Sequence, residues 1–284
     1  MHHATHTAQN KPENWEDLCE KSFFRKAYVI KEEDIPAMLY VNSDQTQIVY
    51  APGNRMTWAP VGSKQVSLVG LEEKQAFTLL VSVAADGTIL PFQAVYRGET
   101  ERSCPSSNAP CMENIKNAGF HLEWSGTKTY WSNQQTMCDF VNHILSLYFD
   151  RIKQRHNLLM SQKSLWQIDV WSVHRSAEFC NWMKKNHPTI ILDFVPGGCT
   201  GIHQPCNVGI QRPLKLSIRR SYHEDIVTEM SGQLQKNGKI GVVDDRSVRW
   251  MWNAWKMVND NPLLVLKVEI NTYQSKCPIS LLIP

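Results

Sequence analysis

The sequence has no apolar stretch that approaches the roughly 20 residues needed to span a bilayer. The N-terminal stretch MHHATHTAQNKPENWEDLCE has no apolar core of the kind that a secretory signal peptide requires. The net charge is only +3, so composition alone does not indicate a nucleic-acid-binding protein. We also find no internal repeat. These absences argue against a membrane protein, a secreted protein and a repeat architecture, and we expect an intracellular protein.

The composition is that of an ordinary globular protein. The 284 residues are 42% hydrophobic and 20% charged, and ten of them are Trp, which favours a sizeable buried core. Eight Cys are scattered along the chain. Because no signal peptide is expected, we interpret them as reduced thiols rather than disulfides.

The distribution of polar and apolar residues divides the chain into a core region and three less regular segments. We expect a polar N-terminal segment at 1–26, flexible or with one short helix at 15–24, followed by a single domain at 27–260. Residues 98–130 contain Cys, Pro, Ser, Asn and Gly, and we interpret them as an insertion or long loop. Residues 261–284 have no clear register and are expected to form an irregular tail.

The first third of the domain predicts an antiparallel meander. Residues 38–41 are aromatic and β-branched, 48–50 can continue that strand, and 51–54 form a turn. Two further strands are expected at 76–84 and 89–96. The Asp86-Gly87 pair between them is a strong hairpin signal.

The later part of the domain alternates helices with strands. Ser132 is the expected N-cap of a helix that ends near Arg155, with Gln135 at the reciprocal capping position. The near-continuous apolar character of 189–195 suits a strand buried on both faces. The remaining expected elements are a strand at 165–170 and helices at 176–185, 212–230 and 247–258. The order predicts a mixed α/β sheet with helices on its faces.

Two acids stand out in this framework. Asp44 is expected at the end of the first strand. The alternative to a functional role is that it forms a turn beside Asn42. Asp169 is expected inside the fourth strand, where a buried carboxylate would need a partner or a metal. The alternative for Asp169 is a strand-edge acid that faces solvent.

Three sequence blocks resemble DDE-type transposases of the pogo/Tigger branch. They are NSDQTQ at 42–47 with the following APG and TWAPVGSK, WQIDVWSVH at 166–174, and DFVPGGCTGIHQPCNVGIQRPLK at 193–215. The resemblance covers roughly 27–230, and its last block is the most specific. It implies a ribonuclease H-like fold and three carboxylates that hold two divalent ions, Mg²⁺ or Mn²⁺, for cutting and joining DNA strands.

The resemblance assigns a role to three positions of this chain. It places the first acid on Asp44, the second on Asp169 and the third on Asn207, which is an amide here. Because hard divalent cations prefer anionic oxygens, we expect the second ion to bind weakly and catalysis to be impaired. Asp193 and Glu178 are substitute ligands if Asn207 fails, although the resemblance places the acid on neither.

A basic segment follows the third position and is the expected DNA contact. Arg212, Lys215, Arg219 and Arg220 predict a phosphate track, although a charge run is more often a solvated helix face. His203 is a candidate for orienting water or touching phosphate, with a hydrogen-bonded loop His as the alternative, and His174 is expected near the site. The family normally carries a helix-turn-helix domain before the catalytic one, and the segment before residue 27 is too short for it.

The resemblance also sets the expected partners. They are DNA and a second copy of the chain, with no membrane and no small-molecule cofactor, and the expected location is the nucleus. A rival function is a non-catalytic DNA- or protein-binding domain descended from a transposase. A rival site is zinc at Cys199, His203 and Cys206, but a structural zinc site normally needs a fourth ligand and none lies beside them.

Overall fold

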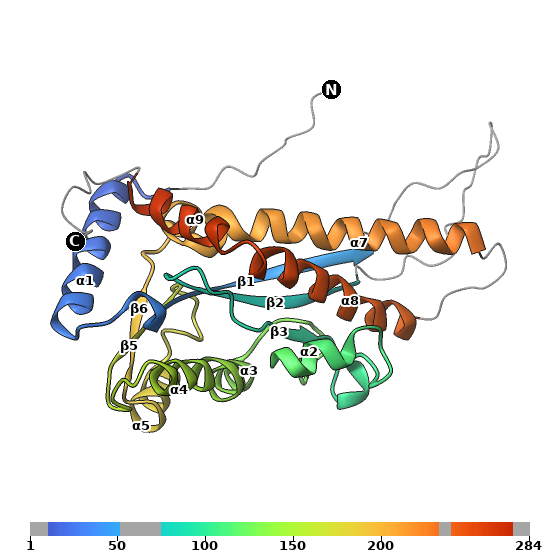
Figure 1. Cartoon of the computed structure of the whole chain (residues 1–284), viewed down its shortest axis with the longest axis horizontal. Helices are drawn as coiled ribbons and strands as arrows, with labels where there is room; N and C mark the ends of the chain where they lie inside the picture. Colours follow the sequence, from blue (N-terminus) through green and yellow to red (C-terminus); the bar gives the residue numbers. More distant parts are fainter. Residues whose placement is uncertain (1–10, 52–74, 233–239, 275–284) are drawn as a thin grey trace.

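The computed structural model describes residues 11–51, 75–232 and 240–274. These residues form a six-stranded sheet with the order β4-β3-β2-β1-β5-β6 (Figure 1). The strands are β1 (Tyr40–Ala51), β2 (Gln75–Ala84), β3 (Gln93–Tyr96), β4 (His121–Trp124), β5 (Ser164–Ile168) and β6 (Ile190–Phe194). The expected turn beyond Ala51, the APG and TWAPVGSK motifs, and the end of the tail at 275–284 lie outside the described residues.

The sheet is mixed, as the sequence predicted. β1, β2 and β3 form an antiparallel meander, whereas β5 adds to β1, β6 adds to β5 and β4 adds to β3, all in parallel. The hairpin between β2 and β3 turns at Asp86-Gly87, and Gly87 has a φ of +99°, a conformation that favours glycine. The hairpin prediction is therefore confirmed.

Helices cover both faces of the sheet. α7, α8 and α9 lie along one face, α3, α4 and α5 lie along the other, and α1 stands beside the β5–β6 end (Figure 1). The α-helices are α1 (Trp15–Glu32), α2 (Met112–Ala118), α3 (Gln134–Phe140), α4 (Ser146–Arg155), α5 (Ala177–Asn186), α6 (Thr200–His203), α7 (Gln211–Gly232), α8 (Ile240–Asn259) and α9 (Pro262–Gln274). Short 3₁₀ segments are η1 (Ala37–Leu39) and η2 (Glu101–Ser103), and π-helical turns are η3 (Val141–Leu145) and η4 (Cys206–Ile210).

Each face of the sheet has its own apolar core because successive strand residues point to opposite sides. On β2, Phe77, Leu79 and Val81 contribute to the core under α7, α8 and α9. Leu80 joins the opposite core, which contains Trp166 of β5 and residues of α3, α4 and α5. The sheet is thus the middle layer of three, which gives its central strands the rigidity that a functional site requires.

Two segments expected to be irregular contain regular structure. The 98–130 segment includes α2 and also β4, whose backbone pairs with β3 from Gln93↔His121 to Tyr96↔Trp124. A strand of only four residues gives too little periodicity to be recognised. Residues 262–274 form α9, whose apolar residues are not confined to one stripe, so its helical period is obscured. The irregular interpretation of these parts was wrong.

Other differences are smaller. α1 extends to Glu32 and so crosses residue 26, where the sequence placed the start of the core. The N-cap of α3 is Asn133 with Thr136 as its reciprocal partner, one residue later than predicted, because both bonds of the capping box form there. β6 lies at an edge of the sheet and is only partly buried, so the expected burial on both faces was wrong. Among the described helices, none combines the length and apolarity needed to cross a membrane.

Candidate active site

Asp44 lies in the middle of β1, and not at the end of the first strand as predicted. β1 continues to Ala51 because its pairing with β2 continues past Asp44, whose register partner is Val81. Val81 belongs to the core beneath α7, α8 and α9. Asp44 is only 9% exposed, so its carboxyl group is a buried acid on a central strand.

Asp169 directly follows the last residue of β5, just beyond the strand in which it was expected. β5 runs parallel to β1 with Asn42 opposite Gln167, so Asp44 and Asp169 each lie two residues past this pair. His174 holds the second acid: its Nδ1 lies 2.7 Å from Asp169 Oδ1. Since the carboxylate is an acceptor, the imidazole carries its proton on Nδ1 in this contact. The side chain of Asp169 is 32% exposed, which leaves it accessible.

The buried carboxyl group of Asp44 is affected by the charges around it. Burial, and next the negative charge of Asp169, raise the pKa of Asp44 to about 8. The backbone N–H of Gln45, the Lys215 ammonium and the Gln211 amide act in the opposite direction. A buried acid beside a second negative charge costs free energy unless a cation or a proton compensates it.

The loop that carries Asn207 docks on the residues just before Asp44. Gln204 Nε2 donates to the carbonyl oxygen of Ser43 at 2.7 Å, and the Cys206 N–H donates to Asn42 Oδ1 at 3.0 Å. Asn207 follows in η4 and is half-buried. The fold therefore brings the third position of the sequence pattern to the same strand segment as the first.

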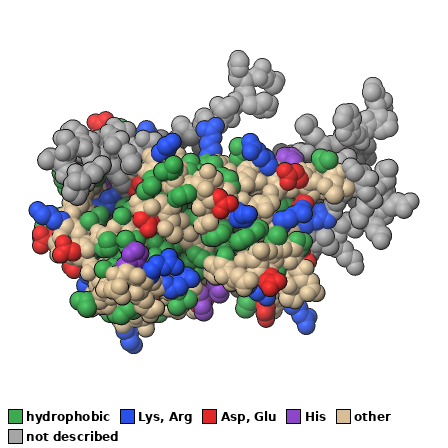
Figure 2. Space-filling view, in the orientation of Figure 1, with side chains coloured by type: hydrophobic (Ala, Val, Ile, Leu, Met, Phe, Trp, Pro, Cys, Tyr) green, Lys and Arg blue, Asp and Glu red, His purple; other side chains and the backbone are tan. Residues whose placement is uncertain are grey.

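Asn207 shares one helix face with basic residues of α7. Asn207, Gln211, Lys215 and Arg219 follow at intervals of one helical turn, and all four line a groove of about 490 Å³ together with Arg212 and Leu216. Gln211 Nε2 donates to Asp44 Oδ2 at 2.6 Å. Figure 2 shows several Lys and Arg side chains along the upper edge of the molecule, where α7 runs. The groove thus joins a buried acid to a row of cations.

Residues 73–263 match the family described as DDE superfamily endonuclease. The chain belongs to that family. The matched segment contains Asp169 and Asn207 and begins after Asp44. Family membership and the mixed sheet together confirm the ribonuclease H-like fold class that the resemblance implied.

This DDE-family chain is similar to a human protein and to solved transposase structures. The Homo sapiens protein "Pogo transposable element with ZNF domain" is 23% identical over 146 residues, which are 51% of this chain and 9% of that protein. The Mos1 mariner paired-end complex with Mn is 10% identical, covering 96% of this chain and 67% of the other, at a TM-score of 0.43. The catalytic domain of Mos1 mariner transposase is 11% identical, covering 92% and 96%, at a TM-score of 0.38. The matched segment is thus a small part of the human protein.

Several predicted site residues of the DDE-family chain take other positions. His203 is 3% exposed, so the expected contact with phosphate does not fit its burial. Asp193 accepts hydrogen bonds from Arg25 and Gln167, which gives the proposed substitute ligand another role. Glu178 is exposed in the first turn of α5. Arg220 is exposed on α7 but is not among the residues that line the groove.

The three residues of the zinc alternative have buried surroundings. Cys199, His203 and Cys206 are all within 3% exposure, and Cys206 Sγ lies 3.3 Å from the carbonyl oxygen of Asn42. Within the described residues, no group of three or more His, Cys, Asp and Glu side chains is placed to hold a metal ion. Burial raises the pKa of the Cys206 thiol well above its usual value, and the Asp44 charge adds to that shift. A thiol of this kind is a packing residue rather than a thiolate ligand.

Gln211 is the site residue that the sequence reasoning missed. It lies one helical turn after Asn207, on the same face, and touches Asp44 directly. A heptad or helical-wheel projection of 207–219 would have placed it beside the third position. The signal was weak because an uncharged amide is not a preferred ligand of a hard divalent cation.

Asp44 and Asp169 are suitable ligands for a hard divalent cation, whereas Asn207 is a weaker one. Asp44 and Asp169 supply two carboxyl groups from corresponding positions on and just after paired strands, and His174 orients the second. Carboxylate oxygens are the ligands that Mg²⁺ prefers. Asn207 adds only a neutral amide oxygen, and Gln211 presents a donor rather than an acceptor to Asp44.

Proposed function

We propose that this domain binds a divalent cation, Mg²⁺ or Mn²⁺, between Asp44 and Asp169 and holds DNA along the α7 groove. We further propose that its ancestral activity, metal-dependent cleavage and transfer of DNA phosphodiesters, is impaired by Asn207. The observation that carries the proposal is the parallel pairing of β1 with β5, which places Asp44 and Asp169 each two residues past the Asn42–Gln167 pair. The family supports the same reaction class.

The two acids have different tasks because their surroundings differ. Asp44 is rigidly placed in β1, so it is the expected shared ligand of the centre. Asp169 is partly exposed and is held by His174, whose Nδ1 lies 2.7 Å from its Oδ1. A divalent ion at this place would stabilise charge on the attacking and leaving oxygens of a phosphodiester. The protein's own contribution is to hold both carboxylates near the α7 groove that would bind DNA.

Asn207 is expected to limit the chemistry. It lines the groove one turn before Gln211, where the family pattern has an acid. Replacing a carboxylate with an amide removes one negative charge from a site for two divalent ions. The first ion can rely on Asp44 and Asp169, whereas a second would depend on a neutral oxygen. We therefore expect one-ion binding and slow or absent cleavage.

The basic face of α7 is the proposed DNA contact. Arg212, Lys215 and Arg219 line the groove that also contains Asn207. Such side chains bind the phosphate backbone and carry no sequence information by themselves. The proposal therefore predicts salt-sensitive binding with little sequence preference. Action on DNA would place the protein in the nucleus, and self-association remains a prediction from the resemblance.

A second candidate function is DNA binding without cutting. It is favoured by the amide of Gln211, which donates to Asp44 at 2.6 Å and so occupies one carboxylate oxygen of the centre. Asn207 also favours this alternative, since a strand-transfer site with only two acids is incomplete. In this alternative the α7 groove would bind DNA equally well with or without divalent ions.

Plasmid nicking in Mn²⁺ separates the two functions. The unmodified chain and Asn207→Asp would be compared, with Asp44→Asn combined with Asn207→Asp as the matched control. We expect Asn207→Asp to nick at least about tenfold faster than the unmodified chain, because the second ion regains a charged ligand. The double variant should be inactive because it lacks the shared ligand.

Two results would contradict the proposal. Equal nicking by the unmodified chain and Asn207→Asp would show that the amide does not impair the centre. DNA binding that EDTA leaves unchanged, with no nicking by either form, would favour the non-catalytic function. Nicking that survives Asp44→Asn would point to a contaminating nuclease.

A further inference from the structure

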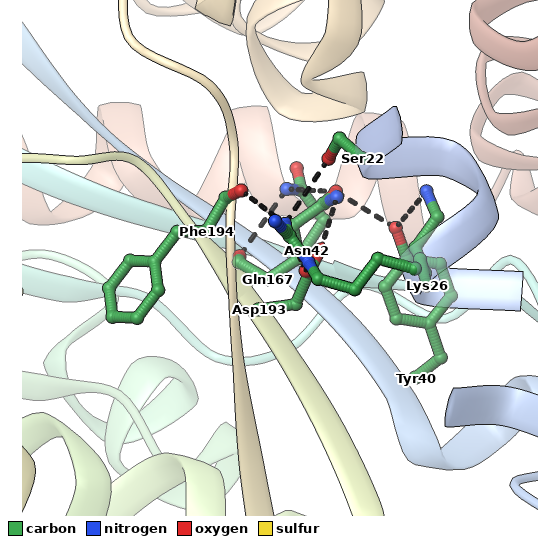
Figure 3. Close-up of polar contacts among 8 residues, drawn as sticks. Ser22, Lys26, Tyr40, Asn42, Gln167, Asp193 and Phe194 are labelled. Carbon is green, nitrogen blue, oxygen red and sulfur yellow. Dashed lines mark hydrogen bonds and ion pairs between the residues drawn. The ribbon is translucent and has the colours of Figure 1, made fainter. Parts of the chain in front are cut away.

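A buried polar network lies directly behind the candidate site. Its central members are Asn42, Gln167 and the backbone of Cys206, which precede Asp44, Asp169 and Asn207 by one or two residues. The network continues to α1 through Tyr40 and Asp193, and Figure 3 shows these side chains converging between β1, β5 and α1. All three segments that bear site residues therefore meet in one cluster of hydrogen bonds.

Asn42 is the junction of this network. Its Nδ2 donates to Gln167 Oε1 at 3.2 Å, and its Oδ1 accepts from the Cys206 N–H at 3.0 Å. Asn42 and Gln167 are both fully buried. One amide side chain on β1 thus bonds both to β5 and to the loop that leads into η4. A buried amide with satisfied bonds on two sides fixes the relative positions of the groups that it joins.

The carboxylate of Asp193 and the N–H of Cys206 determine the donor and the acceptor in each hydrogen bond between them. Asp193 can only accept, so Gln167 must turn its Nε2 toward Asp193 Oδ2, 3.0 Å away, and its Oε1 toward Asn42. Asn42 must then present Nδ2 to Gln167 and Oδ1 to Cys206. Reversing the Asn42 amide would set an NH₂ group against the Cys206 N–H and an oxygen against Gln167 Oε1. The network therefore permits one orientation of the junction.

α1 provides the charged ends. Lys26 Nζ donates to the Tyr40 hydroxyl at 3.2 Å, and that hydroxyl donates to Gln167 Oε1 at 2.8 Å. Arg25, the residue before Lys26, forms an ion pair through its Nη2 with Asp193 Oδ1 at 2.6 Å. Both ends of the network therefore belong to a helix that the sequence suggested was a polar lead-in.

Lys26 has a counter-charge on α9. It is 4% exposed, and Glu269 of α9 is 6% exposed. Burial lowers the pKa of Lys26 and raises that of Glu269, and each charge opposes the shift of the other. α9 also packs closely on η4, since a Cβ at Gly209 would overlap a Val268 methyl group. α1 and α9 together enclose the network.

We propose that Asn42 is a positioning residue that sets the relative places of Asp44, Asp169 and Asn207, and that Lys26 of α1 holds Asn42 in place through Tyr40 and Gln167. The inference depends on the proposed function only in treating the three residues as a metal centre. Bonds of this kind behind metal ligands typically change metal affinity by about 10- to 100-fold when they are lost.

The full chain carries a matched pair of variants for the test. Lys26 and Lys153 are both buried lysines, at 4% and 1% exposure. Lys153 on α4 donates to the carbonyl oxygen of Met160, which is not a member of the network. Lys26→Met and Lys153→Met therefore make the same chemical change inside and outside the network. Asn42→Ala removes the junction itself.

Two measurements would be made on each variant, amide hydrogen exchange of peptides covering 200–211 and Mn²⁺ binding by calorimetry. We expect Asn42→Ala to speed exchange at Cys206 by about tenfold and Lys26→Met by about threefold, because the bond to Asn42 Oδ1 is lost or loosened. Lys153→Met should leave exchange in this segment unchanged. Mn²⁺ affinity should fall about tenfold in the two network variants and remain unchanged in Lys153→Met.

The exchange result decides the inference even if the unmodified chain binds no Mn²⁺. Absence of Mn²⁺ binding in the unmodified chain would overturn the metal centre while leaving the exchange comparison intact. Exchange at 200–211 that is equal in Lys26→Met and Lys153→Met would overturn the role of Lys26. If Asn42→Ala does not fold, Lys26→Met still decides whether α1 supports the loop.

Discussion

Two buried acids of this molecule have similar electrostatics and very different surroundings. Burial and then a second acid raise the pKa of Asp44 to about 8, and the second acid is Asp169. Burial and then Asp139 raise the pKa of Glu123 on β4 to about 8 in the same way. Each acid also accepts a hydrogen bond from a Gln amide, Gln211 for Asp44 and Gln93 for Glu123.

The difference between the two places lies in the neighbouring charges. The groove beside Asp44 is lined by Arg212, Lys215 and Arg219. A pocket of about 390 Å³ beside Glu123 is lined by His121 and His143, whose rings stack at 4.6 Å, and no Lys or Arg is among its described lining residues. A raised carboxyl pKa therefore does not identify a DNA-cutting site by itself. The adjacent row of cations and the parallel strand β5, which ends just before Asp169, distinguish Asp44.

The largest difference is expected in metal binding. Asp44→Asn should reduce Mn²⁺ affinity by at least about 100-fold, because the central charged ligand is lost. Glu123→Gln should leave Mn²⁺ affinity unchanged. Isothermal calorimetry of both variants at one pH makes the comparison direct, and circular dichroism would check that each is folded.

The reverse outcome would be informative. If Glu123→Gln weakened Mn²⁺ binding as much as Asp44→Asn did, the β4–α3 pocket would be the metal site and the assignment of Asp44 would be wrong. A loss in neither variant would show that the bound Mn²⁺ lies elsewhere in the chain.

The sequence predicted much of the site around Asp44 but little of the pocket around Glu123. The alternation of helices and strands predicted the mixed sheet, and the resemblance to DDE-type transposases implied that Asp44, Asp169 and Asn207 share one site. Parallel pairing of β5 with β1 follows from the helix-containing connection between them. The sequence did not show that Asp44 lies mid-strand, since polar residues at 42–47 look like the end of a strand.

The β4–α3 pocket was not accessible in this way. β4 has four residues within a segment interpreted as a loop, so His121 and Glu123 could not be placed facing Asp139 and His143. The support from α1 was missed for a related reason. A single Lys in a polar segment is normally solvated, and only the packing of α1 against β1, with Glu269 opposite, buries Lys26.

An intermediate effect is expected from the charges of the groove. The triple variant Arg212→Gln, Lys215→Gln and Arg219→Gln should weaken binding to a DNA duplex by about 30-fold at moderate salt and lower the salt-dependence slope by about three. The matched control neutralises three exposed lysines elsewhere, Lys128, Lys184 and Lys185. Fluorescence anisotropy over a salt series would measure both. Equal losses in the two triple variants would indicate general charge attraction without a groove.

The smallest of the expected effects is on stability: the titration of Glu123 should make the free energy of unfolding depend on pH. The groups that face this acid are Asp139, the Gln93 amide and His121, whose Nε2 lies 3.8 Å from Glu123 Oε2. The folded state keeps the carboxyl proton up to about pH 8, whereas the unfolded chain loses it near its ordinary value of 4.5. Between these limits the folded state binds more protons, so the free energy of unfolding contributed by Glu123 falls as pH rises.

Glu123→Gln should remove this slope because an amide does not titrate in that range. Urea unfolding at pH 5, 6, 7 and 8 should show stability that declines less for the variant than for the unmodified chain, with the two curves diverging most at pH 8. Because Gln93 Nε2 donates to Glu123, the amide oxygen of the variant can still accept that bond. Parallel curves would mean that Glu123 is ionised in the folded protein, and the electrostatic likeness between the two buried acids would then be lost.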